Sequence, residues 1–196
     1  MDMNGKKLRV AFNSPVILGF TGLCLIALIL DYVTKGYVNT HFFSVYRSSL
    51  VNPLTYVRLF GHVVGHAGMD HFLGNSMLIL VVGPLLEEKY GSYNILFIIL
   101  TTALGTGIVH MLCFPRSALL GASGVVFAFI MLSSFTCVRD GEIPLTFILV
   151  TALYIGGQVY EGLFVSSNVS NLTHILGGLV GAMLGYVMHK YKMNRY

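Results

Sequence analysis

The chain has 196 residues, of which 55% are hydrophobic and only 10% are charged, and its mean hydropathy is +0.76. A soluble domain of this length needs far less apolar surface, so the composition indicates a membrane protein and excludes an ordinary soluble fold. The formal net charge of +4 reflects basic residues near the ends of apolar segments, and it gives no reason to expect nucleic-acid binding.

Six apolar segments predict six transmembrane helices, at roughly 12–31, 71–87, 92–112, 123–137, 144–160 and 172–189. Several of them approach the ~20 residues that an α-helix needs to cross ~30 Å of hydrocarbon. Helices are expected because backbone polar groups in lipid must be satisfied within the protein. We therefore expect an all-α membrane protein, a bundle with one domain over residues 1–196 and short tails at about 1–11 and 190–196.

Basic residues are distributed unequally between the two sides that six spans would create. Eight fall on the side of the two termini, namely Lys6, Lys7, Arg9, Lys89, Arg139, Lys190, Lys192 and Arg195. Four fall on the opposite side, namely Lys35, Arg47, Arg58 and Arg116. Because cytoplasmic loops carry an excess of lysine and arginine, both termini are predicted to be cytoplasmic.

The connection between the first two segments, residues 32–70, is too long for a simple turn and is rich in aromatic residues. This composition is typical of a segment associated with the membrane interface. His62 and His66 lie four residues apart and would share a helical face, with His71 close behind, so a metal site is one interpretation. We favour imidazoles that bond to the loop, because the chain has no HExxH motif and only Asp70 as a nearby carboxylate.

Ser123 begins the fourth apolar segment, within the sequence Gly121-Ala122-Ser123-Gly124. The uncharged run from Ser123 to Val138 covers only ~24 Å at about 1.5 Å per residue, less than the ~30 Å of a hydrocarbon core. Ser123 is therefore expected below the outer membrane surface. Irregular backbone at that depth must be buried in protein or line a water-filled cavity, so we expect the serine in a wet pocket.

His174 lies near the start of the sixth segment, which runs in the same direction as the fourth. Glycines follow it at Gly177 and Gly181, and Gly124 and Ala128 follow the serine. Small residues at four-residue spacing allow two membrane helices to approach closely. An ionisable group at such depth is usually functional, so a serine nucleophile with a histidine base is a candidate catalytic dyad.

A tetrahedral intermediate formed on Ser123 would need hydrogen-bond donors for its oxyanion. The candidates are the Ser123 backbone N–H and the side chains of His71 and Asn75, which lie four residues apart on the second helix. No third catalytic member is expected. Seven of the eight acidic residues fall in loops or at helix ends, namely Asp31, Asp70, Glu87, Glu88, Asp140, Glu142 and Glu161.

Together these motifs resemble those of the rhomboid intramembrane serine proteases, of the minimal six-helix bacterial type, over nearly the whole chain. The segment around Ser123 is similar to the family's GxSG motif, and His174 with its two glycines is similar to HxxGxxxG. His71 and Asn75 match HxxxN, which implies oxyanion roles. The remaining matches imply structural roles and comprise Arg58 in the first loop and GxxxExxxG at Gly83, Glu87 and Gly91.

Two residues beside the candidate dyad depart from the family pattern. Phe127 stands four residues after the serine, where a tyrosine is common, so the ring can pack on His174 but brings no hydroxyl. Thr173 replaces the usual alanine before the histidine, and its hydroxyl could alter the hydrogen bonds of the imidazole.

The resemblance implies an intramembrane serine endopeptidase of a bacterial plasma membrane that cleaves transmembrane segments of other proteins without metal or cofactor. It also implies that the fifth helix and the loop 161–171 control substrate entry. Two alternatives stay open: a non-catalytic rhomboid-like protein that binds membrane clients, and a metal-binding protein built on the three histidines. The sequence does not indicate an oligomeric state.

Overall fold

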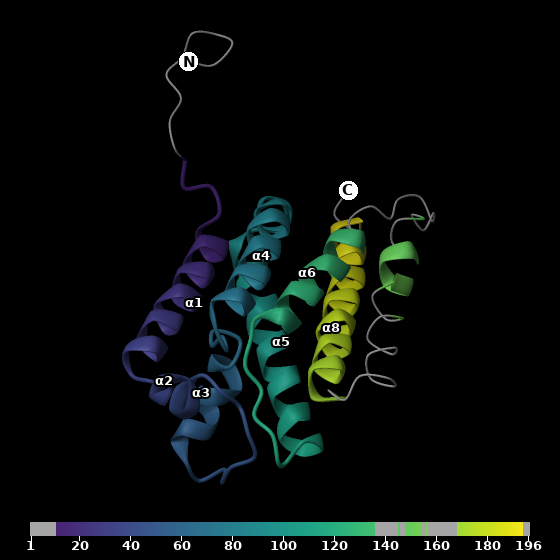
Figure 1. Ribbon diagram of the computed structural model, residues 1–196. Coiled ribbons are helices and arrows are strands. Elements are labelled where there is room, and N and C mark those ends of the chain that lie inside the picture. Colours follow the sequence, from purple (N-terminus) through teal and green to yellow (C-terminus); the bar gives the residue numbers. More distant parts are fainter. Residues whose placement is uncertain (1–10, 136–144, 146–147, 154–155, 157–167, 194–196) are drawn as a thin grey trace.

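A computed structural model describes residues 11–135, 145, 148–153, 156 and 168–193. The regular elements in these residues are helices: α1 (Pro15–Val33), α2 (Tyr37–Phe42), α3 (Pro53–Gly61), α4 (Met69–Tyr90), α5 (Ser92–Cys113), α6 (Ser123–Phe135) and α8 (Asn168–Met193). Within the described part, the β-type pairing is one isolated bridge between Val45 and Leu119. Figure 1 shows the helices as one bundle, with α2 and α3 gathered at one end.

Among the helices that the structure describes, α1, α4 and α5 are long and apolar enough to cross a membrane. The fourth and sixth predicted spans correspond to shorter apolar stretches, Ser123–Ser134 in α6 and Thr173–Val187 in α8. The fifth predicted span, 144–160, falls mostly outside the described residues, although residues 148–153 are helical. Residues 157–167 and the chain ends 1–10 and 194–196 also lie outside them. Of the predicted loop 161–171, residues 168–171 are not loop but the first turn of α8. The prediction of an all-α membrane protein is confirmed.

Glu87, at the end of α4, holds the beginning of α1. Its two carboxylate oxygens accept hydrogen bonds of 3.0 Å from the backbone N–H groups of Val16 and Ile17, and Ser92 Oγ donates to it at 2.6 Å. The first N–H groups of a helix have no partner within the helix, and a carboxylate there also interacts favourably with the helix dipole. Because Glu87 is buried, it joins α1, α4 and α5 at one end of the bundle.

The contact between α1 and α4 is close because α4 carries a glycine there. A Cβ atom added to Gly83 would lie 2.6 Å from Ile17 Cδ1, so a larger residue would force the Ile17 side chain or α1 itself to shift. One turn after Glu87, Gly91 ends α4 and begins α5 with φ of 83°, a conformation that favours glycine.

The first loop is more regular than the sequence predicted, because it contains the two short helices α2 and α3. Asn52 caps α3 by accepting a hydrogen bond from Leu54 N at 3.0 Å, and Pro53 occupies the first helical position. The buried Arg58 donates from Nε to the His41 carbonyl at 2.9 Å and lies 4.4 Å from the centre of the Tyr46 ring. Arg58 therefore fastens α3 to the end of α2.

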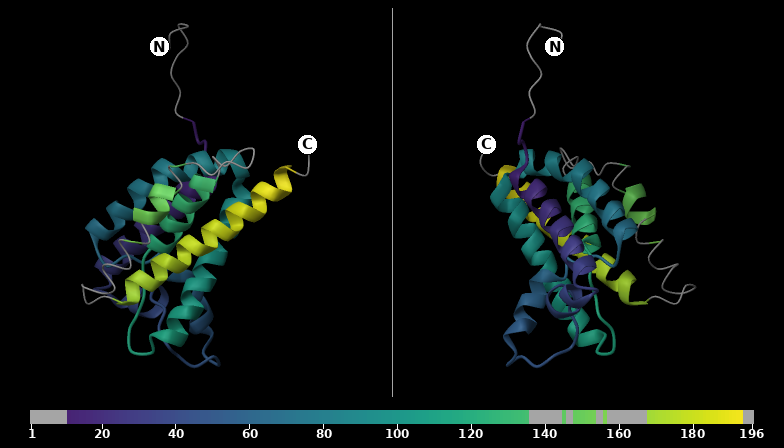
Figure 2. Two further views of the ribbon diagram at one scale, coloured as in Figure 1. Left: turned by 90° about the vertical axis from the view of Figure 1, so that its right-hand side faces the viewer. Right: turned by 60° about the vertical axis from the view of Figure 1, so that its left-hand side comes forward.

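Two observations place the elements around the centre of the bundle. The segment after α5 runs from the α3 end back into the bundle, and α6 begins only there, as Figure 1 shows. α8 packs mainly on α6 and α5 and crosses the bundle obliquely, as both views of Figure 2 show. The start of α6 is thus enclosed by α4, α5 and α8.

Candidate functional site

Ser123 is the first residue of α6, directly after a segment whose backbone conformation favours glycine and is held by a hydrogen bond. Gly121 has φ of 131°, and its N–H donates to the His62 carbonyl at 2.8 Å. The flanking residues Gly121, Ala122 and Gly124 are buried, whereas the Ser123 side chain is half-buried. The serine therefore lies at the N-terminal end of a helix inside the bundle, where it is partly accessible.

The backbones of α6 and α8 touch beside this serine. A Cβ atom on Gly177 would collide with the Gly124 carbonyl oxygen and would lie 2.8 Å from Gly124 Cα. One turn further, a Cβ on Gly181 would lie 2.6 Å from Ala128 Cα. Only glycine at both positions permits this approach, as expected for small residues between membrane helices.

His174 lies one turn before Gly177, and the structure places it against α6. Its ring centroid is 4.6 Å from that of Phe127, with the ring planes tilted by 48°. Phe127 is four residues after Ser123, so the two side chains project from the same face of α6. Ser123 and His174 thus stand on adjacent turns of two helices in backbone contact, with Phe127 packed on the histidine.

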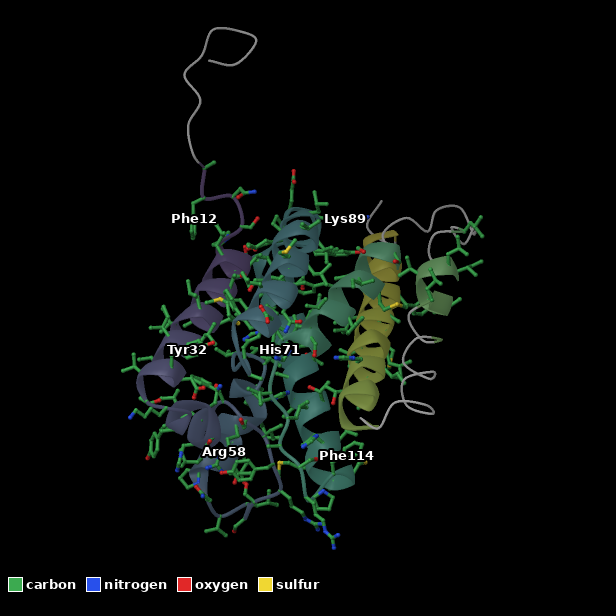
Figure 3. All side chains as sticks on the ribbon, in the orientation of Figure 1. Phe12, Tyr32, Arg58, His71, Lys89 and Phe114 are labelled. Atoms are coloured by element: carbon green, nitrogen blue, oxygen red, sulfur yellow. The ribbon has the colours of Figure 1, made fainter. Side chains whose placement is uncertain are left out.

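His71 approaches the same point from α4. A Cβ added to Gly121 would lie 2.7 Å from His71 Cε1 and 2.9 Å from Nε2, so the imidazole packs directly on the Gly121 backbone. Figure 3 shows His71 between the two ends of the molecule, midway along the bundle. The structure therefore brings His71 into contact with Gly121, which precedes Ser123 by two positions in the sequence.

Asn75 lies one turn after His71 on α4 and is buried. Its Nδ2 finds no hydrogen-bond partner among the described residues. A buried donor without a partner is unusual and calls for an explanation, such as a ligand or an ordered water. Asn75 is thus an unused donor beside the other predicted site residues.

Polar residues of α5 complete the surroundings and were not identified from the sequence. The methyl groups of Thr106 and Thr102 lie 3.5 and 3.8 Å from the position of a Cβ on Gly124, and that of Thr173, on α8, lies 3.7 Å from it. Thr106 Oγ1 also lies 3.2 Å from His62 Nε2. Two threonines four residues apart in an apolar helix are the sequence signal that could have indicated this contact.

His62 and His66 occupy the loop between α3 and α4, and the prediction that they share a helical face is wrong because α3 ends at Gly61. His62 bonds the Leu59 carbonyl at 3.1 Å through Nδ1, and burial lowers its pKa to about 4. His66 bonds the Val64 carbonyl at 3.1 Å, and burial likewise lowers its pKa to about 4. In the described residues, His, Cys, Asp and Glu side chains form no group of three that could hold a metal ion.

The acidic residues that the structure describes have their places and bonds away from the contact between α6 and α8. Asp31 bonds α2, Glu87 bonds the start of α1, and Asp70 stands in the exposed first turn of α4. Glu88 is exposed near the end of α4. The remaining predicted loop or helix-end acids, Asp140, Glu142 and Glu161, lie outside the described residues.

A family model described as the rhomboid domain matches residues 53–191. The chain belongs to the rhomboid family. The rhomboid match begins at Pro53, the first residue of α3, and ends within α8. It includes every residue of the contacts around Ser123, whereas α1 and α2 precede it.

Several curated rhomboid proteins are similar to this chain. Rhomboid-related protein 2 of Mus musculus is 29% identical over 163 residues, which cover 71% of this chain and 53% of that protein. Rhomboid-related protein 1 of Caenorhabditis elegans is 32% identical over 132 residues, 63% of this chain and 37% of that protein. Rhomboid protease GluP of Bacillus subtilis (strain 168) is 27% identical over 170 residues, which cover 83% of this chain and 32% of that protein. The chain spans about half or less of the length of these relatives.

Proposed function

We propose that this rhomboid is an intramembrane serine endopeptidase in which Ser123 is the nucleophile and His174 the general base. The observation that carries the proposal is the backbone contact of α6 and α8 at Gly124 and Gly177, with the His174 ring packed on Phe127. Serine and histidine in such proximity are the two groups that nucleophilic acyl transfer requires. The protease named among the relatives supports the same reaction.

In the proposed reaction, Ser123 Oγ attacks the carbonyl carbon of the scissile peptide bond while His174 takes its proton. The tetrahedral intermediate collapses, the C–N bond breaks, and His174 gives the proton to the leaving amine. Water then attacks the acyl ester with His174 again as base, which releases a carboxylic acid and regenerates the serine. Phe127 packs on one side of the imidazole and restricts its orientation.

Three donors serve the oxyanion in this proposal: the Ser123 backbone N–H, His71 and Asn75. Support comes from the contact of the His71 imidazole with Gly121 and from the unpartnered, buried Nδ2 of Asn75. Preorganised donors of this kind each contribute about 10²–10³-fold in rate. No metal or cofactor takes part.

We also propose that residues 1–196 form one membrane domain in a bacterial plasma membrane, with both termini cytoplasmic. The basic residues of the termini and Lys89 support this orientation. Lys89 and Phe12 lie at one end of the molecule, and Arg58 and Phe114 lie at the other, as Figure 3 shows. The substrates are transmembrane segments of other membrane proteins, which reach Ser123 from the bilayer.

The test is cleavage of a single-span model substrate by purified protein in liposomes. Ser123→Ala and His174→Ala are each expected to abolish cleavage. Ser134→Ala is the matched control, because Ser134 lies on the same helix and bonds only locally, to the Ile130 carbonyl at 3.0 Å. Full activity of Ser123→Ala would refute the mechanism. Substrate binding without cleavage by the unaltered protein would favour the client-binding alternative.

A further inference from the structure

Asp31, in the last turn of α1, binds one residue of α2 with both carboxylate oxygens. Oδ1 accepts from the Asn39 backbone N–H and Oδ2 accepts from Asn39 Nδ2, each at 2.9 Å. Asn39 is buried, and its Nδ2 makes a second bond of 2.9 Å to the His66 carbonyl. Since both partners of Nδ2 can only accept, the orientation of this amide is unambiguous.

The His66 carbonyl belongs to the same peptide unit as the Ala67 N–H, which donates to His71 Nδ1 at 3.5 Å. A trans peptide is planar, so the direction of its carbonyl also sets the direction of its N–H. Asn39 and His71 therefore bond to opposite sides of one rigid unit. With Nδ1 as the acceptor of this bond, the imidazole would carry its proton on Nε2, the atom that faces Gly121.

Close packing holds this peptide unit against α2. A Cβ atom on Gly65 would lie 2.8 Å from Phe43 Cβ and 3.0 Å from Asn39 Oδ1, and one on Gly61 would lie 2.7 Å from the Phe42 carbonyl oxygen. The His66 ring also packs edge-on against the His71 ring, with centroids 5.1 Å apart. The loop before α4 thus has little freedom to reorient on its own.

We infer that Asp31 and Asn39 are positioning residues for His71: through the His66–Ala67 peptide they fix the orientation and tautomer of an oxyanion donor. The inference rests on the proposed function. Neither residue touches the reacting atoms, and both precede the part of the chain that matches the rhomboid domain. Asp31 therefore serves the reaction from a distance, although it is no third member of the dyad.

The first test is Asn39→Ala, which removes both side-chain bonds and leaves the backbone bond to Asp31. Cleavage in liposomes should show kcat reduced about tenfold with KM within about twofold of the unaltered protein, because the donor acts on the transition state and not on substrate binding. Thr40→Ala is the matched control, since Thr40 is the next residue of α2 and bonds only the Gly36 carbonyl, at 2.8 Å. It should keep the kcat of the unaltered protein.

A double variant identifies the route of the effect. If Asn39 acts through His71, Asn39→Ala should cause no further loss of kcat once His71→Ala is present, because the two residues then act as one unit. A general structural defect would add its loss to that of His71→Ala, and such additivity would overturn the inference.

A second double variant, Asp31→Asn with Asn39→Asp, separates positioning from the fastening of α1 to α2. It exchanges the donor and acceptor between the two side chains and so retains both bonds between positions 31 and 39, but it leaves the His66 carbonyl without its donor. The bonds between positions 31 and 39 should keep α1 fastened to α2, although a carboxylate beside the unpaired His66 carbonyl should lower the thermal unfolding midpoint. We expect a kcat as low as that of Asn39→Ala. Restoration of kcat would overturn the inference, and this variant decides the matter if Asn39→Ala does not fold.

The two proposals fail in different ways. Cleavage by Ser123→Ala would refute the proposed function, and the inference with it. If cleavage depends on Ser123 but Asn39→Ala behaves like Thr40→Ala, only the inference is refuted.

Discussion

Gly177→Ala tests whether the backbone contact of α6 and α8 sets up the reaction. The added Cβ would lie 2.8 Å from Gly124 Cα, whereas ordinary contact begins at 3.4 Å, so α6 and α8 must separate by about 0.6 Å (3.4 minus 2.8) at this point to restore it. The Gly124 carbonyl oxygen is closer still and demands a larger shift. His174 is one turn away on α8 and must move with it.

A displacement of about 1 Å between reacting groups lowers a rate by up to about 10²-fold. We therefore expect kcat of Gly177→Ala for a single-span substrate in liposomes to fall by 10- to 100-fold. Overpacking should also lower the free energy of unfolding by about 1–3 kcal/mol, which thermal unfolding in detergent would measure.

The matched control is Gly105→Ala, a helical glycine of α5 that also faces α8. Its Cβ would meet Val180 Cγ2 at 3.9 Å, an ordinary contact. Alanine is the better helix former by about 0.8–1 kcal/mol, so the control should be active and slightly stabilised. The reasoning is refuted if Gly177→Ala keeps its kcat within twofold, or if both variants lose activity equally.

Three further predictions concern the ends and the centre of the bundle. Glu87→Ala should lower the free energy of unfolding by about 1–3 kcal/mol, because the part-buried N–H of Val16 and the buried N–H of Ile17 lose their acceptor. An unchanged unfolding midpoint in detergent would contradict this role of Glu87. Burial lowers the pKa of His62 to about 4, from the ordinary histidine value of 6.5 that it has in the unfolded chain. The free energy of unfolding should therefore be highest above pH 6.5 and fall by up to about 3 kcal/mol as the pH drops towards 4. Unfolding midpoints at pH 7.5 and pH 5 measure this loss of stability. If His62→Asn shows the same pH dependence as the unaltered protein, His62 is not its cause. Gly121→Ala should reduce kcat at least tenfold, because alanine rarely adopts a φ of 131° and its Cβ would lie 2.7 Å from His71 Cε1. Gly74→Ala is the control and should keep its kcat, because the space around Gly74 is open.

The long helices were predictable because their signal is local. The predicted spans 71–87 and 92–112 agree closely with α4 and α5, and the first span differs from α1 by two or three residues. Apolar length decides such elements, since a membrane helix satisfies its own backbone. The close approach of α6 and α8 was also visible in advance, because glycines at four-residue spacing mark a contact face.

The first loop was predicted less well, and its short helices show why. Helices of six and nine residues are marginal by themselves, so tertiary contacts decide whether they form. The Asn52-Pro53 pair was a readable start signal for α3. Nothing comparable marks α2, whose start at Gly36 depends on the left-handed conformation of that residue and on the carboxylate of Asp31.

By itself the sequence determined the environment and the elements: apolar segments long enough for a bilayer, the glycines that let two of them touch, and Ser123 and His174 near their starts. Only the tertiary structure decided which distant groups meet. The two bonds of Glu87 to α1 join residues that are 71 and 70 positions apart in the sequence. The bond of Asn39 to the His66 carbonyl joins residues that are 27 positions apart. Local patterns carry no record of such pairs, because a hydrogen bond between distant residues depends on how all the intervening helices pack.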